Sequence, residues 1–167
     1  MKNICSFSAL VLFAILVMEA CSTVKKSNDP PASTNAASMQ LRKRIIDKAE
    51  KYVGTNYKYA GTSPGTGFDC SGFTSFVLKE FNVQVSSASA AQAKQGYKIP
   101  LDRAKPADLI FFGDSNRIQH VAMVVKRTKD GIICVHSTTS RGVIVENVST
   151  STYWKPKILF ARDVLSK

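Results

Sequence analysis

The chain has 167 residues, of which 44% are hydrophobic, so it can build one domain with its own apolar core. Charged residues make up 21%, which excludes a long, highly charged disordered protein. The formal net charge of +11 predicts an affinity for polyanions or acidic surfaces, and the alternative is a solvated basic face.

The first twenty residues have the features of an export signal. A basic start, Met1–Asn3, precedes the apolar run Phe7–Met18, which is too short for an ordinary membrane span. Ala20 directly before Cys21 resembles a bacterial lipobox, in which the cysteine is acylated. We therefore expect a signal peptide at 1–20 and a lipid anchor on Cys21, and we expect the protein in the outer membrane, facing the periplasm. A plain secretory signal cut near Ala20 is the alternative.

An exported protein would seldom meet nucleic acid, so the anionic cell wall and lipid headgroups are the expected partners of the positive charge. After the leader, Ser22–Ser38 is rich in Ser, Asn, Ala and Pro. This composition predicts a disordered tether at 21–38 and a folded domain at 39–167.

The folded part predicts helices first and strands afterwards. An amphipathic helix is expected from Leu41 to Gly54, a second helix begins at Cys70, and a short one covers 90–94. Apolar runs bounded by turn residues predict strands at 108–112, 119–126, 132–136, 143–145 and 158–161. This order of elements predicts an α+β fold with an antiparallel sheet.

The stretch Gly67–Gly72 presents a cysteine at a helix start. Asp69 is a typical N-cap residue, and Cys70 shares the inward face of the helix with Phe73 and Val77. We expect the helix dipole to lower the pKa of the Cys70 thiol and prepare it as a nucleophile. A small buried hydrophobe is the alternative for any cysteine, and a disulfide with Cys134 would satisfy the cysteine count but destroy this site.

The chain contains two histidines, His120 at the start of one expected strand and His136 at the end of the next. A hairpin would bring both to one edge of the sheet. A strict two-residue turn at Asp130-Gly131 would place His120 opposite Arg141, so a longer turn or a bulge is needed. We expect His120 to act as the base for Cys70 and His136 to orient His120, with Cys134 packed beneath His136.

Several short motifs stand in a characteristic order along the chain: Tyr57, Gly61, Gly67–Gly72, Asp108–Phe112, His120-Val121 and Val135-His136. Together they resemble the NlpC family of papain-like cell-wall cysteine peptidases. Gly142–Val145 and Tyr153–Lys155 further resemble the Spr-like murein endopeptidase lipoproteins. The resemblance implies a papain-like NlpC fold, with N-terminal helices packed on a central antiparallel sheet and with no cofactor or metal.

The resemblance also implies roles for individual residues. Cys70 matches the nucleophile, His120 the base and His136 the third triad member. Tyr57 matches a tyrosine that supports the oxyanion or the substrate. Asp69 and Ser71 match substrate-lining positions, although both also suit a local role at the helix start. Three alanines, Ala60, Ala107 and Ala122, stand where the family has glycine.

The expected function is hydrolysis of amide bonds in peptidoglycan stem peptides or cross-links, by a monomer and through a thioester acyl-enzyme. The lack of room before Leu41 for an SH3-like domain favours polymeric wall as the substrate. A non-catalytic peptidoglycan-binding lipoprotein and a lipid-amide acyltransferase or hydrolase on the same fold are the alternatives. A zinc site made of Cys70, His120, Cys134 and His136 is the weakest idea, since the usual short ligand spacings are missing.

Overall fold

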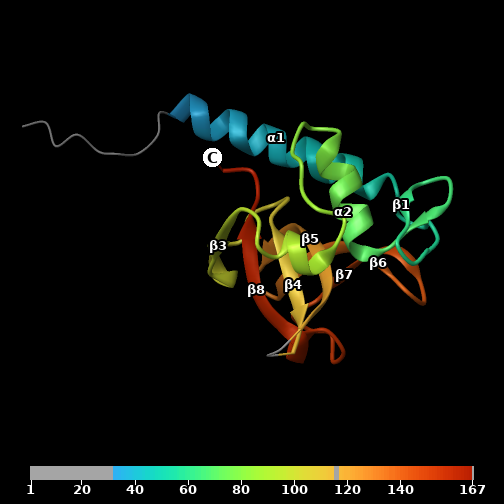
Figure 1. Ribbon diagram of the computed structural model, residues 1–167. Coiled ribbons are helices and arrows are strands. Elements are labelled where there is room, and N and C mark those ends of the chain that lie inside the picture. The colour runs from blue at the N-terminus through green and yellow to red at the C-terminus, as the bar shows by residue number, and fades with distance from the viewer. Residues whose placement is uncertain (1–31, 115–116, 167) are drawn as a thin grey trace, which may run out of the picture. The chain divides into compact units, whose positions relative to one another are not determined.

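The computed structural model describes residues 32–114 and 117–166 (Figure 1). The expected signal peptide, the lipidation site Cys21 and the tether up to residue 31 lie outside the described residues. The described helices are α1 (Ala32–Glu50), α2 (Cys70–Lys79) and α3 (Ser89–Gln92), with 3₁₀ turns at Leu101–Arg103 and Lys155–Lys157. The described strands are β1 (Thr62–Ser63), β2 (Gly67–Phe68), β3 (Tyr97–Ile99), β4 (Leu109–Gly113), β5 (Ile118–Thr128), β6 (Gly131–Thr138), β7 (Gly142–Asn147) and β8 (Ile158–Asp163).

One six-stranded antiparallel sheet forms the centre of the described chain, with the strand order β3-β8-β4-β5-β6-β7. Strands β4 to β7 follow one another as neighbours, whereas β8 crosses over to pair with the free side of β4. The short strands β1 and β2 pair with each other beside the start of α2. The predicted α+β class with an antiparallel sheet is confirmed, and β3 is an edge strand that the sequence pattern did not predict.

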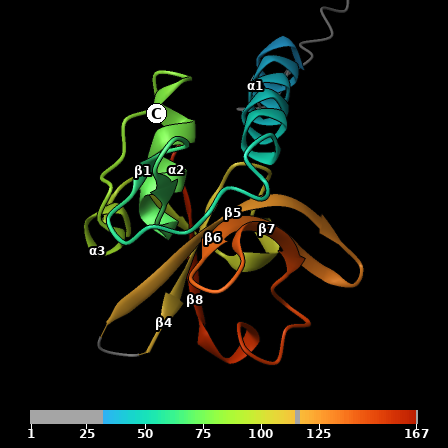
Figure 2. The same ribbon diagram turned by 90° about the vertical axis from the view of Figure 1, so that its right-hand side faces the viewer.

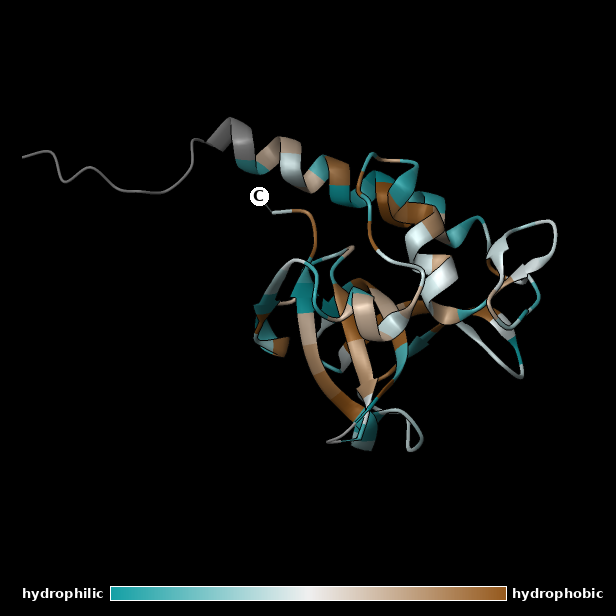
Figure 3. Ribbon diagram, viewed as in Figure 1, coloured by the Kyte–Doolittle hydropathy of each residue, from teal (hydrophilic) through white to brown (hydrophobic). Residues whose placement is uncertain are grey.

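Helices α1 and α2 lie on the same side of this sheet (Figure 2). Their inward residues, among them Ile45 and Phe73, are fully buried in one core cluster with Phe111, Met123 and Val135 of the sheet. In Figure 3 hydrophobic colours run along the central strands, while α1 alternates hydrophilic and hydrophobic residues, as an amphipathic helix should.

A second, smaller apolar cluster covers the opposite face of the sheet. Ile110, Phe112 and Cys134 are fully buried there, and Trp154 from the segment before β8 packs against them. Because both faces of the central strands are covered, β4 can be a continuous apolar run rather than an alternating one.

Helix α1 begins at Ala32, nine residues before the start expected at Leu41. The expectation of a disordered tether is therefore wrong for residues 32–38. The segment contains three alanines, which have the highest helix propensity and extend the amphipathic helix outward beyond its packed part. At the other end α1 stops at Glu50, and Val53, expected on the apolar stripe, is 49% exposed.

A buried ionic cluster fixes α1 to the sheet. Arg42 is 2% exposed, and its guanidinium lies 2.6 Å from Asp108 just before β4 and 2.9 Å from Asp163 at the end of β8. One guanidinium nitrogen also donates to the Pro106 carbonyl at 2.7 Å. Because a bare buried charge is costly, this arrangement defines where α1 sits on the domain.

Candidate active site

The turn that leads into α2 holds Cys70 in a defined position. The Asp69 carboxylate accepts a hydrogen bond from the N–H of Gly72 at 2.6 Å, which makes Asp69 the N-cap as predicted. The Asp69 N–H donates to the carbonyl of Gly61 at 3.0 Å. A Cβ on Gly72 would lie 2.0 Å from that same carbonyl oxygen, so only glycine allows this close approach.

The Cys70 thiol is half-buried and faces a pocket. Burial raises its pKa, and hydrogen bonding to the backbone of Val121 and to Ser71 offsets this only in part, while the Asp69 charge raises the pKa further. The expectation that the helix start lowers the pKa of Cys70 is therefore wrong, because desolvation outweighs the hydrogen bonds that favour the thiolate. The sulfur is consequently a neutral thiol at neutral pH, and it needs a base to become a nucleophile.

The β5–β6 hairpin brings the two histidines into contact. Thr128 pairs with Gly131, so the two-residue turn is Lys129-Asp130 and not the expected Asp130-Gly131. A bulge between Val124 and Lys126 then shifts the pairing further in the same direction. Nε2 of His120 lies 2.8 Å from Nδ1 of His136. Both side chains are buried, and the predicted meeting of the two histidines is found.

A carboxylate that sequence reasoning missed follows His136 in this chain of contacts. Oε1 of Glu146 lies 3.0 Å from Nε2 of His136, and it accepts hydrogen bonds at 2.9 Å from both Trp154 Nε1 and an Arg141 guanidinium nitrogen. His136 pairs with Ile144 across β6 and β7, so Glu146 stands one diagonal step away on the same face. The alternation along residues 142–147 could have indicated this, once the register was known.

Aromatic rings enclose the histidine pair. The Trp154 ring stacks on the His120 imidazole with centroids 4.4 Å apart and planes 25° apart, and it meets His136 edge-on. Phe112 contacts both His120 and Trp154. These contacts restrict the rotation of the His120 ring and keep water from one of its faces.

Burial also determines the charge of the two histidines. Burial and the neighbouring His136 lower the pKa of His120 well below its usual 6.5. Burial lowers the pKa of His136 to about 4, although the Glu146 carboxylate opposes this shift. Both imidazoles are therefore neutral at neutral pH, so each has one nitrogen that donates and one that accepts.

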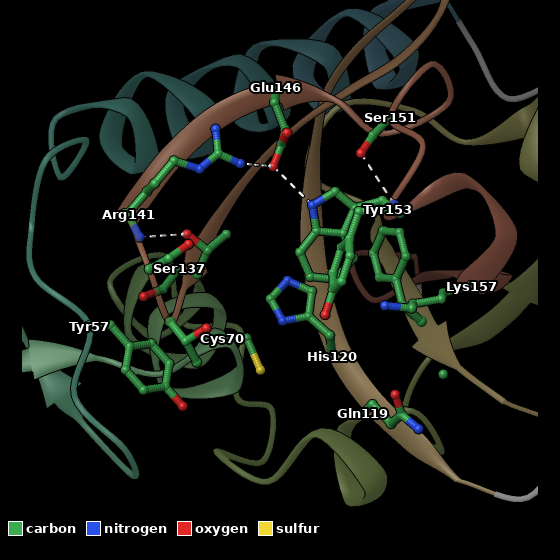
Figure 4. Close-up of a pocket in the computed structure, with 16 residues that line it drawn as sticks. Tyr57, Cys70, Gln119, His120, Ser137, Arg141, Glu146, Ser151, Tyr153 and Lys157 are labelled. Atoms are coloured by element: carbon green, nitrogen blue, oxygen red, sulfur yellow. Dashed lines mark hydrogen bonds and ion pairs between the residues drawn. The ribbon is translucent and has the colours of Figure 1, made fainter.

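Cys70 and His120 share one cavity of about 440 Å³ (Figure 4). Tyr57 lies beside Cys70 in this view, and the His120 ring lies across from the sulfur. Around them the lining combines the aromatic rings of Phe112 and Trp154 with polar or partly polar side chains, namely Gln119, Ser137, Thr138, Thr139, Ser140, Arg141, Glu146, Ser151, Tyr153 and Lys157. The Lys157 ammonium lies 3.1 Å above the Tyr153 ring. The cavity can therefore hold a polar ligand between a thiol and a base.

The other predicted site residues differ in their surroundings. Tyr57 lines the cavity, and burial and the charges of Cys70 and Asp69 raise its pKa. Asp69 and Ser71 are not among the lining residues. The Asp69 carboxylate caps α2, and the Ser71 hydroxyl donates to the Ser87 carbonyl at 2.7 Å, so both make the local contacts of a helix start.

The structure bears on two alternatives from the sequence, the Cys70–Cys134 disulfide and the zinc site. Cys70 and Cys134 are free thiols, so they form no disulfide with each other. Across residues 32–114 and 117–166, no group of three or more His, Cys, Asp or Glu side chains is arranged to hold a metal ion. The same described ranges contain no helix with the length and apolarity needed to cross a membrane.

Comparison with known proteins gives a consistent result. The profile of the NlpC/P60 family matches residues 54–163. A gamma-DL-glutamyl hydrolase from Bacillus subtilis (strain 168) is 28% identical over 168 aligned positions, which cover 98% of this chain and 38% of that protein. A probable endopeptidase p60 from Listeria welshimeri is 33% identical over 118 positions, covering 71% of this chain and 21% of that protein.

Solved structures agree with the sequence relatives. An NlpC/P60 family protein from Bacillus cereus superimposes with a TM-score of 0.68 and 29% identity, covering 75% of this chain and 40% of that one. The NlpC/p60 domain of the peptidoglycan hydrolase SagA gives a TM-score of 0.60 and 32% identity, covering 71% and 95% of the two chains. The chain thus spans well under half the length of the two sequence relatives named above. The family match, the confirmed fold and these structures together show that the chain belongs to the NlpC/P60 family.

Proposed function

We propose that this chain is a peptidoglycan hydrolase, a murein endopeptidase that cleaves amide bonds of stem peptides or cross-links with a Cys-His-His triad. The observation that carries the proposal is the shared cavity of Cys70 and His120, in which His120 is held by His136 at 2.8 Å. The names of two relatives, an endopeptidase and a gamma-DL-glutamyl hydrolase, point to the same chemistry.

In this proposal Nδ1 of His120 takes the thiol proton, because Nε2 is occupied by His136. The Cys70 sulfur attacks the carbonyl carbon of the scissile amide and forms a tetrahedral oxyanion. The Cys70 N–H stabilises this oxyanion, a contact worth about 3–4 kcal/mol in enzymes where it has been measured. The Tyr57 hydroxyl, on the same cavity, is the second proposed donor.

Collapse of the oxyanion breaks the C–N bond. The leaving amine takes the proton from His120 and departs, and the acyl group stays on Cys70 as a thioester. His120 then removes a proton from water, the hydroxide attacks the thioester, and the carboxylic acid product leaves as the thiol is restored. The cycle needs no cofactor, since the thiol and the imidazole supply every proton transfer.

The lining of the cavity favours a peptide over a lipid amide. Ser137, Thr138 and Ser151 line the cavity together with the cations Arg141 and Lys157. Stem peptides carry free carboxylates that such cations attract, whereas an acyl chain would require an apolar groove. Asp69 and Ser71 make local hydrogen bonds at the start of α2. They could contact the substrate, as proposed, only if the start of this helix shifted.

The proposed place of action is the cell envelope, reached through the export signal at 1–20 and lipidation of Cys21. An anchor in the outer membrane facing the periplasm would hold a monomer beside the wall. The strong positive charge of the chain, +11, supports contact with anionic wall polymers or lipid headgroups.

Digestion of purified peptidoglycan tests the proposal, with the released muropeptides identified by mass. The wild-type chain and its Cys134→Ala variant should release the same peptides, and Cys70→Ala should release none. Equal products from Cys70→Ala would contradict the thiol mechanism. Binding of the wild-type chain to the wall without any cleavage would favour the non-catalytic alternative.

A further inference from the structure

Three side-chain nitrogen atoms converge on a single oxygen of Glu146. Oε1 receives the indole N–H of Trp154 and a guanidinium N–H of Arg141, both at 2.9 Å, and it lies 3.0 Å from Nε2 of His136. The Glu146 side chain is 20% exposed, so most of it is shielded from water. Arg141 and Trp154 also lower the pKa of this carboxyl against the opposing effect of burial. Glu146 is therefore an ionised, acceptor-only group directed at His136.

This acceptor determines which nitrogen of each histidine carries its proton. A carboxylate can only accept, so Nε2 of His136 must be the protonated nitrogen. Nδ1 of a neutral His136 then has a lone pair and accepts from His120, whose Nε2 must likewise carry its proton. Nδ1 of His120 is thereby left as the unprotonated nitrogen.

We propose that Glu146 is a positioning residue that, through His136, keeps Nδ1 of His120 free to accept the Cys70 proton. The proposal rests on the proposed function for its catalytic meaning, since it presumes that His120 is the base. Glu146 acts at a distance of two imidazole rings and does not itself take the proton.

The same oxygen also stabilises the ring that stacks on His120. Trp154 donates its indole N–H to Glu146 and covers the His120 imidazole at 4.4 Å. Glu146 thus holds His120 by two routes, one along the hydrogen-bond chain and one through the stacked indole. To stabilise β7 alone, Glu146 would need only its ion pair with Arg141. It also contacts Trp154 and His136, which lie on the inner side.

Imidazole nitrogen NMR of the full-length chain tests the assignment, because the sequence contains two histidines and the spectrum is simple. Long-range nitrogen–carbon-proton correlations distinguish a ring protonated at Nε2 from one protonated at Nδ1. In the wild-type chain we expect both His120 and His136 to be protonated at Nε2. A wild-type His136 protonated at Nδ1 overturns the proposal without any variant.

Three variants separate positioning from bracing. Glu146→Leu removes the acceptor, and we expect a shift toward Nδ1 protonation in both rings and a fall in kcat of roughly 10–100-fold, with KM changed less than about threefold. Glu146→Gln keeps an acceptor oxygen and should restore the Nε2 form and most of kcat. Glu80→Leu is the matched control, since it removes a carboxylate paired with Lys48 on α1.

The results that would refute this role of Glu146 differ from the result that would refute the proposed function. Unchanged tautomers and unchanged kcat in a folded Glu146→Leu variant would overturn the proposal. A rise in KM with kcat unchanged would overturn it as well. If Glu146→Leu does not fold, the wild-type spectrum and Glu146→Gln decide the question. A wild-type chain with the expected tautomers but no cleavage of peptidoglycan would refute the proposed function and leave the tautomer assignment standing.

Discussion

Nε2 of His120 lies 2.8 Å from Nδ1 of His136, although sixteen residues separate the two in the chain. The turn at Lys129-Asp130 and a bulge in the β5–β6 hairpin allow this contact, and His120 lines the same cavity as Cys70. Burial raises the pKa of the thiol and lowers that of the imidazole, so the resting pair is neutral.

The pH dependence of catalysis follows from the neutral pair. His120 must be unprotonated to accept the thiol proton, and burial lowers its pKa well below 6.5. Activity should therefore persist at pH 6.5 and fall only as the pH drops further below that value. A profile of kcat/KM against pH checks this. Half of the activity lost at or above pH 6.5 would contradict the buried, neutral state of His120.

Stability should also depend on His136. Its pKa is about 4 in the folded chain against 6.5 in an unfolded one, so the unfolded state binds the proton more readily. The stabilising effect is complete above pH 6.5 and is lost as the pH falls from 6.5 toward 4, by up to about 3 kcal/mol. Denaturant unfolding of the wild type and His136→Gln across this range measures it. Parallel curves for the two proteins would contradict the expectation.

The Arg42 cluster makes a prediction about the fold. Burial raises the pKa of Asp108 even with Arg42 beside it, so Arg42→Met would leave the Asp108 and Asp163 carboxylates without their cation. We expect a loss of about 3–5 kcal/mol in the free energy of unfolding. Lys43→Met, which breaks an exposed ion pair with Asp47 on the same helix, should cost less than about 1 kcal/mol. Equal losses in the two variants would refute the anchoring role.

Gly72 links backbone clearance to catalysis. Gly72→Ala would place a methyl group 2.0 Å from the Gly61 carbonyl, so either the loop or the start of α2 must move. We expect at least a tenfold loss of kcat and a loss of about 1–3 kcal/mol in stability. In the control Gly65→Ala the new methyl group meets an ordinary contact at 3.8 Å, and activity should be unchanged. Full activity in Gly72→Ala would contradict a defined Cys70 position.

The sequence predicted those parts of the site that depend on local patterns. Asp69 and Cys70 were placed at a helix start by capping and periodicity, and the strand pattern placed both histidines at one edge. Glu146 was missed because its contact with His136 depends on the β6–β7 register, which no local pattern fixes. The predicted lowering of the Cys70 pKa is wrong for a similar reason. Burial raises this pKa, and burial is a property of the packed domain.

Helix α1 also has features that local patterns predict and features that depend on the packed fold. Its amphipathic part was predicted, but Arg42 looked like a surface residue until its two carboxylate partners were brought in from β8 and the segment before β4. Its early start at Ala32 reflects alanine propensity, which competed with a composition typical of disorder.

Stepwise alkylation of the full-length chain tests the central claim most directly. Samples are treated with increasing amounts of a thiol-directed reagent, the fraction of modified Cys70 is read by peptide mass, and wall-cleaving activity is measured on the same samples. Activity should fall in direct proportion to Cys70 modification and reach zero when every Cys70 is blocked, while buried Cys134 stays unmodified. A chain with fully modified Cys70 that still cleaves peptidoglycan would contradict the account.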